Sequence, residues 1–264
     1  MKTFEEYTKE IVDKILATLQ KQRMDKELVS HIYEGVESRV IDYVWKKSGA
    51  DREEPLPEGG TLMILAPFVT EAADVVHIRI RVEGDFVTWF RNQENYVIDP
   101  YVEEIGRLVA AHEATAIIQG LIKEAKEFPV TSDRPAKPEV MKAAEWIRNN
   151  KHHADTLVIN PEHQVKLVEN NEIFERWLFP LSLWDKKGSH FCGIMDGIEV
   201  YWTPYIAKDV SLLYEKSQVR LKRTPIVIKF DDPNNPRNLL IEEDCVAWAV
   251  DNNAIAKLCL KPKQ

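Results

Sequence analysis

Residues 74–90 constrain the fold of this chain more than any other stretch of the sequence. Polar and apolar side chains alternate from His77 to Val82, which is the period of a β-strand with one polar and one apolar face. The turn signal Glu83–Asp85 and the β-rich run Phe86–Phe90 follow. The sequence therefore predicts a β-hairpin. Because a two-stranded hairpin is marginally stable alone in water, we expect it to pack against something outside itself.

The first 60 residues are predicted to form two helices and a linker. Apolar residues recur at helical spacing in residues 3–20, which predicts an amphipathic helix. The same spacing continues from Asp25 to Trp45 and ends in basic residues, which predicts a second helix. Residues 51–60 hold two prolines and two glycines among charged side chains, and we interpret them as a linker.

A long helix is predicted to start near Asp99 and Pro100, which suit the cap and the first position of a helix. Apolar residues at helical spacing continue it to Ala125, for about six to seven turns. The rest of the chain mixes both periods, so we expect an α+β fold. A shorter helix is expected at 140–147 and a strand at 156–159. Asn160 and Pro161 suit the cap and first position of a further helix at 162–168. More strands are expected at 198–201, 212–214, 219–221, 226–230, 239–241, 245–250 and 254–260.

The composition is that of a folded protein. Of the 264 residues, 44% are hydrophobic and 30% charged, which excludes disordered and collagen-like chains. The 43 Asp and Glu outnumber the 35 Lys and Arg, which argues against a surface built as a whole to bind nucleic-acid phosphates. Three cysteines at long spacings predict neither a disulfide framework nor a zinc site. No stretch resembles a signal peptide or a membrane span, so we expect a protein that stays in a cytoplasm.

No motif predicts a catalytic, cofactor-binding or metal site. The chain has 10 glycines, and they form none of the glycine-rich loops that bind phosphates. His152, His153 and His163 with Glu162 are a conceivable group of metal ligands. Adjacent histidines on a loop point in different directions, however, so surface histidines are the preferred interpretation.

Two further groups of residues each have a chemical and a structural interpretation. Cys192 follows His190 by two residues, which on a strand would place a thiol and a base on one face. No catalytic signature surrounds this pair, so a buried structural cysteine is preferred. The acidic triplet Glu242–Asp244 could bind a cation or supply an acid and a base. Because neighbours on a strand face opposite sides, a solvated turn or a subunit contact is favoured.

Four short motifs occur in an order that resembles one known family. They are "EATAIIQG" at 113–120, "LVINPE" at 157–162, "GIEVYWTP" at 197–204, and a closing strand at 246–250 followed by Asn253 and Ala254. With the hairpin and the long helix before them, they resemble the major capsid protein of tailed bacteriophages and related viruses, which shares its fold with encapsulin shell proteins. The resemblance covers roughly residues 61–260 and rests on order and spacing, since each motif alone is weak.

The resemblance implies a particular organisation of the α+β fold, the tailed-phage capsid or encapsulin-like fold. It consists of an N-terminal helical arm, an extended β-hairpin loop, a peripheral domain with a long spine helix, and an axial domain. On this sequence the arm would be 1–60, the extended loop 61–96, the peripheral domain 97–135 with 211–243, and the axial domain 136–210 with 244–264.

The resemblance also implies a function, that of a structural shell subunit without enzymatic activity or cofactor. Copies of the chain would assemble, as pentamers with or without hexamers, into an icosahedral particle. The preferred interpretation is a major capsid protein of a virion assembled in the host cytoplasm, with scaffolding or portal proteins and packaged double-stranded DNA as partners. The alternative is an encapsulin, a cytoplasmic nanocompartment around cargo proteins. A soluble α/β enzyme or ligand-binding protein would need a concave polar site that no motif supplies.

In this family the extended loop reaches onto a neighbouring subunit, which would give the predicted hairpin the support that its own chain lacks. His77, Arg79, Arg81 and Trp89 are the residues expected at that interface, with the three basic side chains meeting acids of the neighbour. A solvated strand face is the alternative. Some family members cross-link their subunits through a lysine on this loop. No lysine occurs between Lys47 and Lys123, so that chemistry is not expected here.

Overall fold

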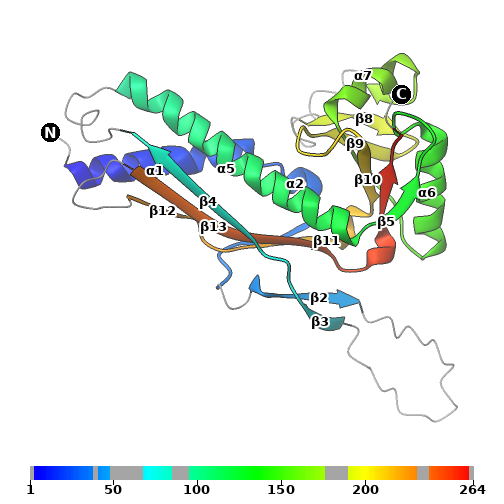
Figure 1. Ribbon diagram of the computed structural model, residues 1–264, viewed down its shortest axis with the longest axis horizontal. Coiled ribbons are helices and arrows are strands. Elements are labelled where there is room, and N and C mark those ends of the chain that lie inside the picture. The colour runs from blue at the N-terminus through cyan, green and yellow to red at the C-terminus, as the bar shows by residue number, and fades with distance from the viewer. Residues whose placement is uncertain are drawn as a thin grey trace, which may run out of the picture.

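The computed structural model describes residues 3–37, 41–47, 68–84, 95–175, 190–230 and 238–261. These residues form two main β-sheets, one toward each end of an elongated molecule, and helix α5 extends from one sheet to the other (Figure 1). The helices are α1 Phe4–Gln22, α2 Asp25–Leu28, α5 Asn95–Glu124, α6 Lys137–Asn149 and α7 Pro161–Glu169, with short 3-10 turns η2 Lys216–Gln218 and η3 Asn252–Ala254.

The first sheet is built around one long strand. Its strands are β1 His31–Tyr33, β4 Val76–Glu83, β11 Val219–Arg223, β12 Val227–Phe230 and β13 Asn238–Ala249. The order is β1-β11-β13-β12. Outside this path, β4 also pairs with β13, along residues 238–245. Helices α1 and α5 cover one face, where apolar side chains of both helices pack on Leu239 and Ile241 of β13. The predicted stripe of α1 is the buried one, since Tyr7, Ile11, Ile15 and Leu19 are all buried.

Two glycines of α5 allow the helices and the sheet to approach closely. A Cβ atom on Gly120 would lie 2.6 Å from the carbonyl oxygen of Ala247 in β13, and one on Gly106 would lie 2.8 Å from Cγ2 of Thr18 in α1. Both distances are shorter than van der Waals contact. The absence of a side chain at these two positions therefore fixes how deeply α5 sits between α1 and the sheet.

The second sheet is mixed and has helices α6 and α7 beside it (Figure 1). Its order is β5-β14-β10-β6-β9-β8-β7, with the two edge strands being short. Its core contains Val140 and Ile147 of α6, Leu167 of α7, and strand residues such as Leu157 and Leu213. The strands are β5 Lys126–Pro129, β6 Thr156–Ile159, β7 Phe174–Glu175, β8 Phe191–Met195, β9 Ile198–Trp202, β10 Val210–Tyr214 and β14 Ile255–Cys259.

The remaining strands, β2 Tyr43–Lys47 and β3 Phe68–Ala72, form a separate antiparallel pair. In Figure 1 this pair lies apart from both main sheets, below β11 and β13. We call β2 and β3 together the ribbon.

The prediction of a second N-terminal helix is wrong beyond Leu28. Residues 31–33 instead pair in parallel with β11, and Gly35 follows with a φ of 66°, which a helix does not allow. Ile41 and Val44, which were assigned to a helix stripe, are buried against Val246 and Trp248 of β13. The apolar spacing of this stretch matches strand packing as well as a helix, and the tertiary contacts decide between them.

Most other predicted elements are confirmed with shifted ends. The long helix begins at Asn95, so Pro100 lies inside it and not at its first position. Pro100 is the sixth residue of α5 and lies past the four N–H groups that lack an intrahelical partner, so the helix forgoes one backbone hydrogen bond, to the Tyr96 carbonyl oxygen. The strands predicted at 239–241 and 245–250 are one continuous strand, β13. The Asn160 cap of α7 is as predicted, accepting a hydrogen bond from the backbone of Glu162.

The predicted hairpin differs in its partner. Its first strand is present as β4, but β4 pairs antiparallel with β13 over eight residues, from Val76 opposite Cys245 to Glu83 opposite Asn238. The expectation that this strand lacks support from its own chain is therefore wrong. The apolar residues Ile78, Ile80 and Val82 face α1 and α5, so the alternation reflects an ordinary half-buried strand. The second predicted strand, 86–90, lies outside the described residues.

Candidate functional site

The polar face of β4 holds three of the four residues predicted at a subunit interface. His77 Nδ1 lies 2.7 Å from Asp244 Oδ1, and Arg79 Nε lies 3.9 Å from Glu242 Oε1. Both acids belong to β13 of the same chain. The His77 and Arg79 side chains are still 62% and 71% exposed, and Arg81 is exposed beside them. This face is thus accessible along β4, while Trp89 lies outside the described residues.

The ribbon is the part of the described chain with the least support from the two main sheets. Tyr43 pairs opposite Ala72 and Lys47 opposite Phe68, and no third strand joins this pair among the residues that the structure describes. Two strands alone are marginally stable in water. The ribbon therefore depends on its attachment to the body, which is made by several contacts of β2 that include those of Trp45.

An aromatic cluster attaches the ribbon to the first sheet. Trp45 packs edge-to-face on Trp248 of β13 with ring centroids 5.0 Å apart, and Trp248 Nε1 donates a hydrogen bond of 2.9 Å to the Trp45 carbonyl oxygen. Tyr33 of β1 packs on Trp45 with a centroid distance of 5.3 Å. We call Tyr33, Trp45, Lys222 and Trp248 the ribbon anchor. Its rings bury large apolar area in a fixed geometry.

Lys222 of β11 adds a positive charge to the ribbon anchor. Its Nζ lies 4.8 Å from the ring centroid of Trp45 and 5.5 Å from that of Trp248, and it donates a hydrogen bond to the Tyr43 carbonyl oxygen. Only 4% of this residue is exposed, and burial lowers the pKa of its ammonium group. A cation over two indole faces contributes a cation–π attraction that is stronger when desolvated.

The last two residues of β2, Lys46 and Lys47, also contact the body. Lys46 Nζ lies 2.7 Å from Glu124 Oε1, and the other oxygen of Glu124 accepts a 2.7 Å hydrogen bond from the backbone of Ala249. The backbone of Lys47 donates to the Val250 carbonyl oxygen at 2.7 Å. The ribbon is thus held on the body along β2, from Tyr43 to Lys47, and its Lys47–Phe68 end continues into residues 48–67.

The residues considered for catalysis are not arranged for it. Cys192 is buried, and His190 Nδ1 pairs with Glu27 Oε2 of α2 at 2.9 Å. The Cys192 thiol donates a hydrogen bond to the backbone carbonyl oxygen of His190 at 3.8 Å. The structural interpretation of Cys192 fits this arrangement.

The histidines proposed as metal ligands are separated in the structure. His152 lies between Glu215 and Asp251, at 2.9 Å and 3.0 Å from their carboxylate oxygens. His163 is buried and donates from Nε2 to the Lys208 carbonyl oxygen at 2.7 Å, and burial lowers its pKa. Within the described ranges, no group of three His, Cys, Asp or Glu side chains is placed to hold a metal ion.

The acidic triplet of β13 is divided between two faces, as its alternation predicts. Glu242 lies 3.0 Å from Lys229 and Asp244 pairs with His77, both on the exposed face. Glu243 points the other way and is buried beside Arg23 and Glu113. Sequence reasoning missed this buried group, because its members lie about 90 and 130 residues apart and no local spacing connects them.

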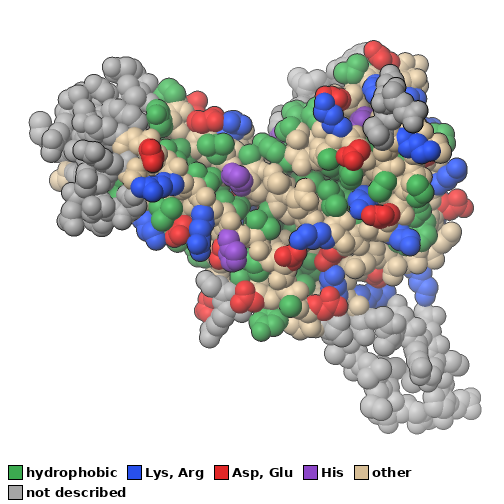
Figure 2. Space-filling view, in the orientation of Figure 1, with side chains coloured by type: hydrophobic (Ala, Val, Ile, Leu, Met, Phe, Trp, Pro, Cys, Tyr) green, Lys and Arg blue, Asp and Glu red, His purple; other side chains and the backbone are tan. Residues whose placement is uncertain are grey.

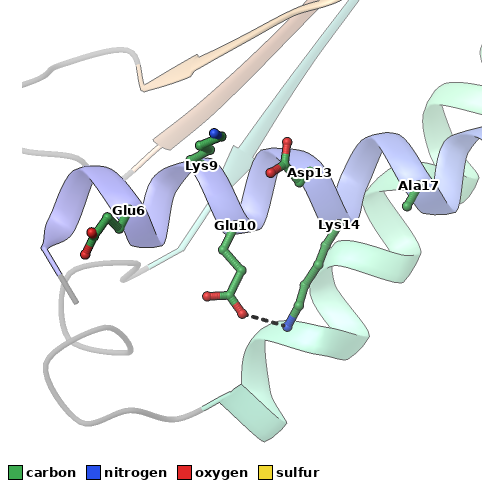
Figure 3. Close-up of a pocket in the computed structure, with 6 residues that line it drawn as sticks. All are labelled: Glu6, Lys9, Glu10, Asp13, Lys14 and Ala17. Carbon is green, nitrogen blue, oxygen red and sulfur yellow. Dashed lines mark ion pairs between the residues drawn. The ribbon is translucent and has the colours of Figure 1, made fainter. Parts of the chain in front are cut away.

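Two of the larger surface depressions in the described part are lined by no cysteine, serine or histidine. One, of about 560 Å³, follows the outer face of α1 and is lined by Glu6, Lys9, Glu10, Asp13, Lys14 and Ala17, with Lys14 paired to Glu10 (Figure 3). The other, of about 530 Å³, lies between Lys46, Lys47 and Glu71 of the ribbon, the end of α6 and residues 250–253. Positive and negative side chains are interspersed over the face in Figure 2. None of the described helices combines the length and apolar character needed to cross a membrane.

This chain is similar to known proteins in its structure and not in its sequence. The sequence matches no protein-family model and no curated protein. The structure is similar to that of a virus-like particle from Pyrococcus furiosus, with 15% identity, coverage of 96% of this chain and 99% of the other, and a TM-score of 0.61. It is also similar to a structure from Gordonia phage Cozz, with 10% identity, coverage of 92% and 87%, and a TM-score of 0.60.

A third similar structure is the holo-SrpI encapsulin complex from Synechococcus elongatus PCC 7942. Identity is 11%, coverage is 89% of this chain and 88% of the other, and the TM-score is 0.58. The chain thus has the mixed α+β fold of phage capsid and encapsulin proteins across most of its length, as the resemblance implied.

Proposed function

We propose that this chain is a structural shell subunit that assembles with copies of itself into a closed icosahedral particle. The observation that carries the proposal is the ribbon, which is held on the body along β2 and has no third strand among the described residues. A ribbon of this kind gains stability by lying against another molecule. The fold similarity supports the same conclusion, because it spans nearly the full length of a chain from a virus-like particle.

The preferred identity is a viral major capsid protein around packaged double-stranded DNA, with pentamers and hexamers, scaffolding and portal proteins as its partners. The second candidate is an encapsulin around cargo proteins, and the similarity to the Synechococcus encapsulin complex favours it. In either case the subunit has a structural and not a catalytic role. In this proposal the first sheet with α5 corresponds to the peripheral domain and the second sheet to the axial domain. The bounds expected from the sequence then shift, because β10 pairs within the second sheet and β13 lies within the first.

Particle size tests the proposal directly. The purified protein is examined by size-exclusion chromatography with light scattering and by negative-stain imaging. Closed particles of megadalton mass are expected. A protein that stays monomeric or dimeric at every concentration would contradict the proposal and favour a soluble enzyme or binding protein. Nucleic-acid absorbance of particles from the native source then separates the two identities, since DNA inside supports the capsid and protein cargo supports the encapsulin.

The exposed face of β4 is a second contact with a neighbouring subunit in this proposal. The charge reversals Arg79→Glu with Arg81→Glu are expected to reduce particle yield more than they reduce monomer stability, because exposed charge pairs set register between molecules. Lys142→Glu with Arg148→Glu on the exposed side of α6 is a control with the same change in charge. Equal particle yield from wild type, variant and control would remove β4 from the interface.

A further inference from the structure

A buried group of charged side chains joins the N-terminal segment to the body. Arg23 follows α1 and Asp25 begins α2, while Glu113 comes from α5, Arg223 from β11 and Glu243 from β13. We call these five residues the charge cluster, and residues 23–34 the strap. The strap contains α2 and β1. It reaches the body through this cluster, through the pairing of β1 with β11, and through Met24, Leu28 and Val29, which are buried in the core.

The distances within the charge cluster are those of direct ion pairs. Arg23 Nε lies 2.8 Å from Glu113 Oε2, and Arg23 Nη2 lies 3.1 Å from Glu243 Oε1. Arg223 Nη1 lies 2.7 Å from Asp25 Oδ2. The side chains of Asp25, Glu113, Arg223 and Glu243 are all 5% exposed or less, and that of Arg23 is 13% exposed.

The charges in this cluster do not balance if every group is ionised. Three carboxyl groups then face two guanidinium groups, and Glu243 Oε2 has no hydrogen-bond partner within the described structure. A buried carboxylate oxygen without a partner is costly. A proton on Glu243 removes both problems, because it equalises the buried charges and lets Glu243 donate a hydrogen bond to the Glu113 carboxylate.

The environment of Glu243 favours that proton. Burial, followed by the hydrogen bond and negative charge of Glu113, raises the pKa of Glu243 to about 9, against the opposing effect of Arg23 and Arg223. Cys245 lies two residues along β13, and burial raises the pKa of its thiol to about 12. The residue opposite Glu243 on β4 is Ile78, which carries no charge.

We propose that the charge cluster is a proton-dependent clamp, in which a proton shared by Glu243 and Glu113 holds the strap on α5, β11 and β13, and loss of that proton favours release of the strap. No property of a shell is needed for this inference, so it stands or falls independently of the proposed function.

The direction of the pH effect follows from the closed and open states. In the open state Glu243 is solvated and releases its proton in the ordinary carboxyl range, whereas in the closed state it keeps the proton up to about pH 9. The clamp is therefore fully stabilised below the ordinary carboxyl range, and this stabilisation is lost as pH rises toward 9. Between those limits, the open fraction grows about tenfold for each pH unit.

Two other ionisable side chains bear on the strap, Glu34 at its end and His190 against α2. Glu34 pairs with Arg223, whose hydrogen bond lowers the pKa of this carboxyl, so its contribution is lost only as pH falls through the acidic range. His190 Nδ1 lies 2.9 Å from Glu27 Oε2 of α2, so a second ionisable side chain is in direct contact with the strap. The variant His190→Gln therefore has to be measured in parallel.

Hydrogen exchange measures the release of the strap. Deuterium uptake of peptides covering residues 25–34 is followed from about pH 6 to pH 8.5 and divided by the intrinsic exchange rate at each pH, which leaves the open fraction. In wild type this fraction should rise about tenfold per pH unit. Glu243→Gln keeps a neutral hydrogen-bonding group and should make the fraction independent of pH. Glu242→Gln, on the exposed face of the same strand, should behave like wild type, and peptides of α6 should not respond.

A wild-type open fraction that does not change with pH would overturn the proposal, and so would a Glu243→Gln variant that keeps the wild-type slope. Loss of the slope in His190→Gln would transfer the effect to that histidine and equally overturn it. If Glu243→Gln does not fold, infrared spectroscopy of wild type decides. A protonated-carboxyl band at pH 7 that disappears above about pH 9 supports the clamp, and its absence at pH 7 contradicts it.

Discussion

At the scale of single residues, the close contact between α5 and β13 depends on the absence of a side chain at Gly120. Gly120 faces the sheet near the C-terminal end of α5, inside the helix, where glycine is normally unfavourable by about 1 kcal/mol relative to alanine. A Cβ atom on residue 120 would lie 2.6 Å from the carbonyl oxygen of Ala247. Local propensity and tertiary packing therefore make opposite demands at this position, and packing prevails.

Gly120→Ala is accordingly expected to destabilise the protein by about 1–3 kcal/mol, because α5 would have to move away from β13. The free energy of unfolding, measured by urea denaturation, checks this. Gln119→Ala, at the exposed neighbouring position, should change stability by less than about 0.5 kcal/mol. Stabilisation by Gly120→Ala would mean that helix propensity dominates and that the contact is looser than described.

At the scale of elements, the ribbon, and not strand β4, is the β-structure with few partners in its own chain. β4 is paired along eight residues with β13, whereas the ribbon pairs only within itself among the described residues. Its stability therefore comes from the ribbon anchor, in which Trp45 contacts Tyr33, Lys222 and Trp248.

Trp45→Ala should loosen the ribbon without unfolding the body. We expect faster hydrogen exchange in β2 and β3, unchanged exchange in α6, and lower particle yield, since the ribbon then meets its neighbour in many conformations. Trp146→Ala, which removes an aromatic contact with Phe128 in the second sheet, is a control that should leave exchange in the ribbon unchanged. Equal protection of the ribbon in wild type and Trp45→Ala would show that the anchor does not hold it.

At the scale of the whole molecule, one histidine connects the two main sheets. His152, from the loop after α6, contacts Glu215 at the end of β10 and Asp251 at the end of β13. Burial alone would raise the pKa of both carboxyls. Hydrogen bonds outweigh it, from Ser217, His153 and His152 to Glu215 and from Asn253 and His152 to Asp251, so both pKa values are lowered.

This connection predicts a loss of stability on the acid side. Carboxyls with lowered pKa values contribute stability above their ordinary range, and this contribution is lost as pH falls through that range. His152→Ala should cost about 1–3 kcal/mol at pH 7 and lose less stability than wild type between pH 7 and about pH 3.5. Unfolding free energies at the two pH values test this. The same acid loss in both proteins would exclude His152 as the cause.

A second prediction for the whole molecule concerns covalent bonds between subunits. Lysine is absent between Lys47 and Lys123, so no amine in this stretch can form an isopeptide cross-link. Denaturing gels of assembled particles should therefore show monomer bands only. A ladder of covalent multimers would contradict this and would point to an amine elsewhere in the chain.

Local patterns in the sequence predicted those elements whose contacts lie on one regular face. The stripe of α1, the cap of α7 and the alternation of β4 were visible because helix and strand periods repeat within a few residues. The segment from Val29 to Lys47 is predicted incorrectly for the same reason. Its apolar spacing fits a helix, yet β11 and the ribbon supply strand partners that no local pattern reveals.

The sequence by itself determined which faces are apolar, where the long helix runs, and that the α+β pattern resembles a shell protein. Only the tertiary structure decided which strand is paired within the chain, which ribbon depends on an anchor, and that Glu243 lies buried against Glu113 and Arg23. The reason is physical. Periodicity is a property of neighbouring residues, whereas strand pairing and charge balance depend on residues brought together from distant parts of the chain.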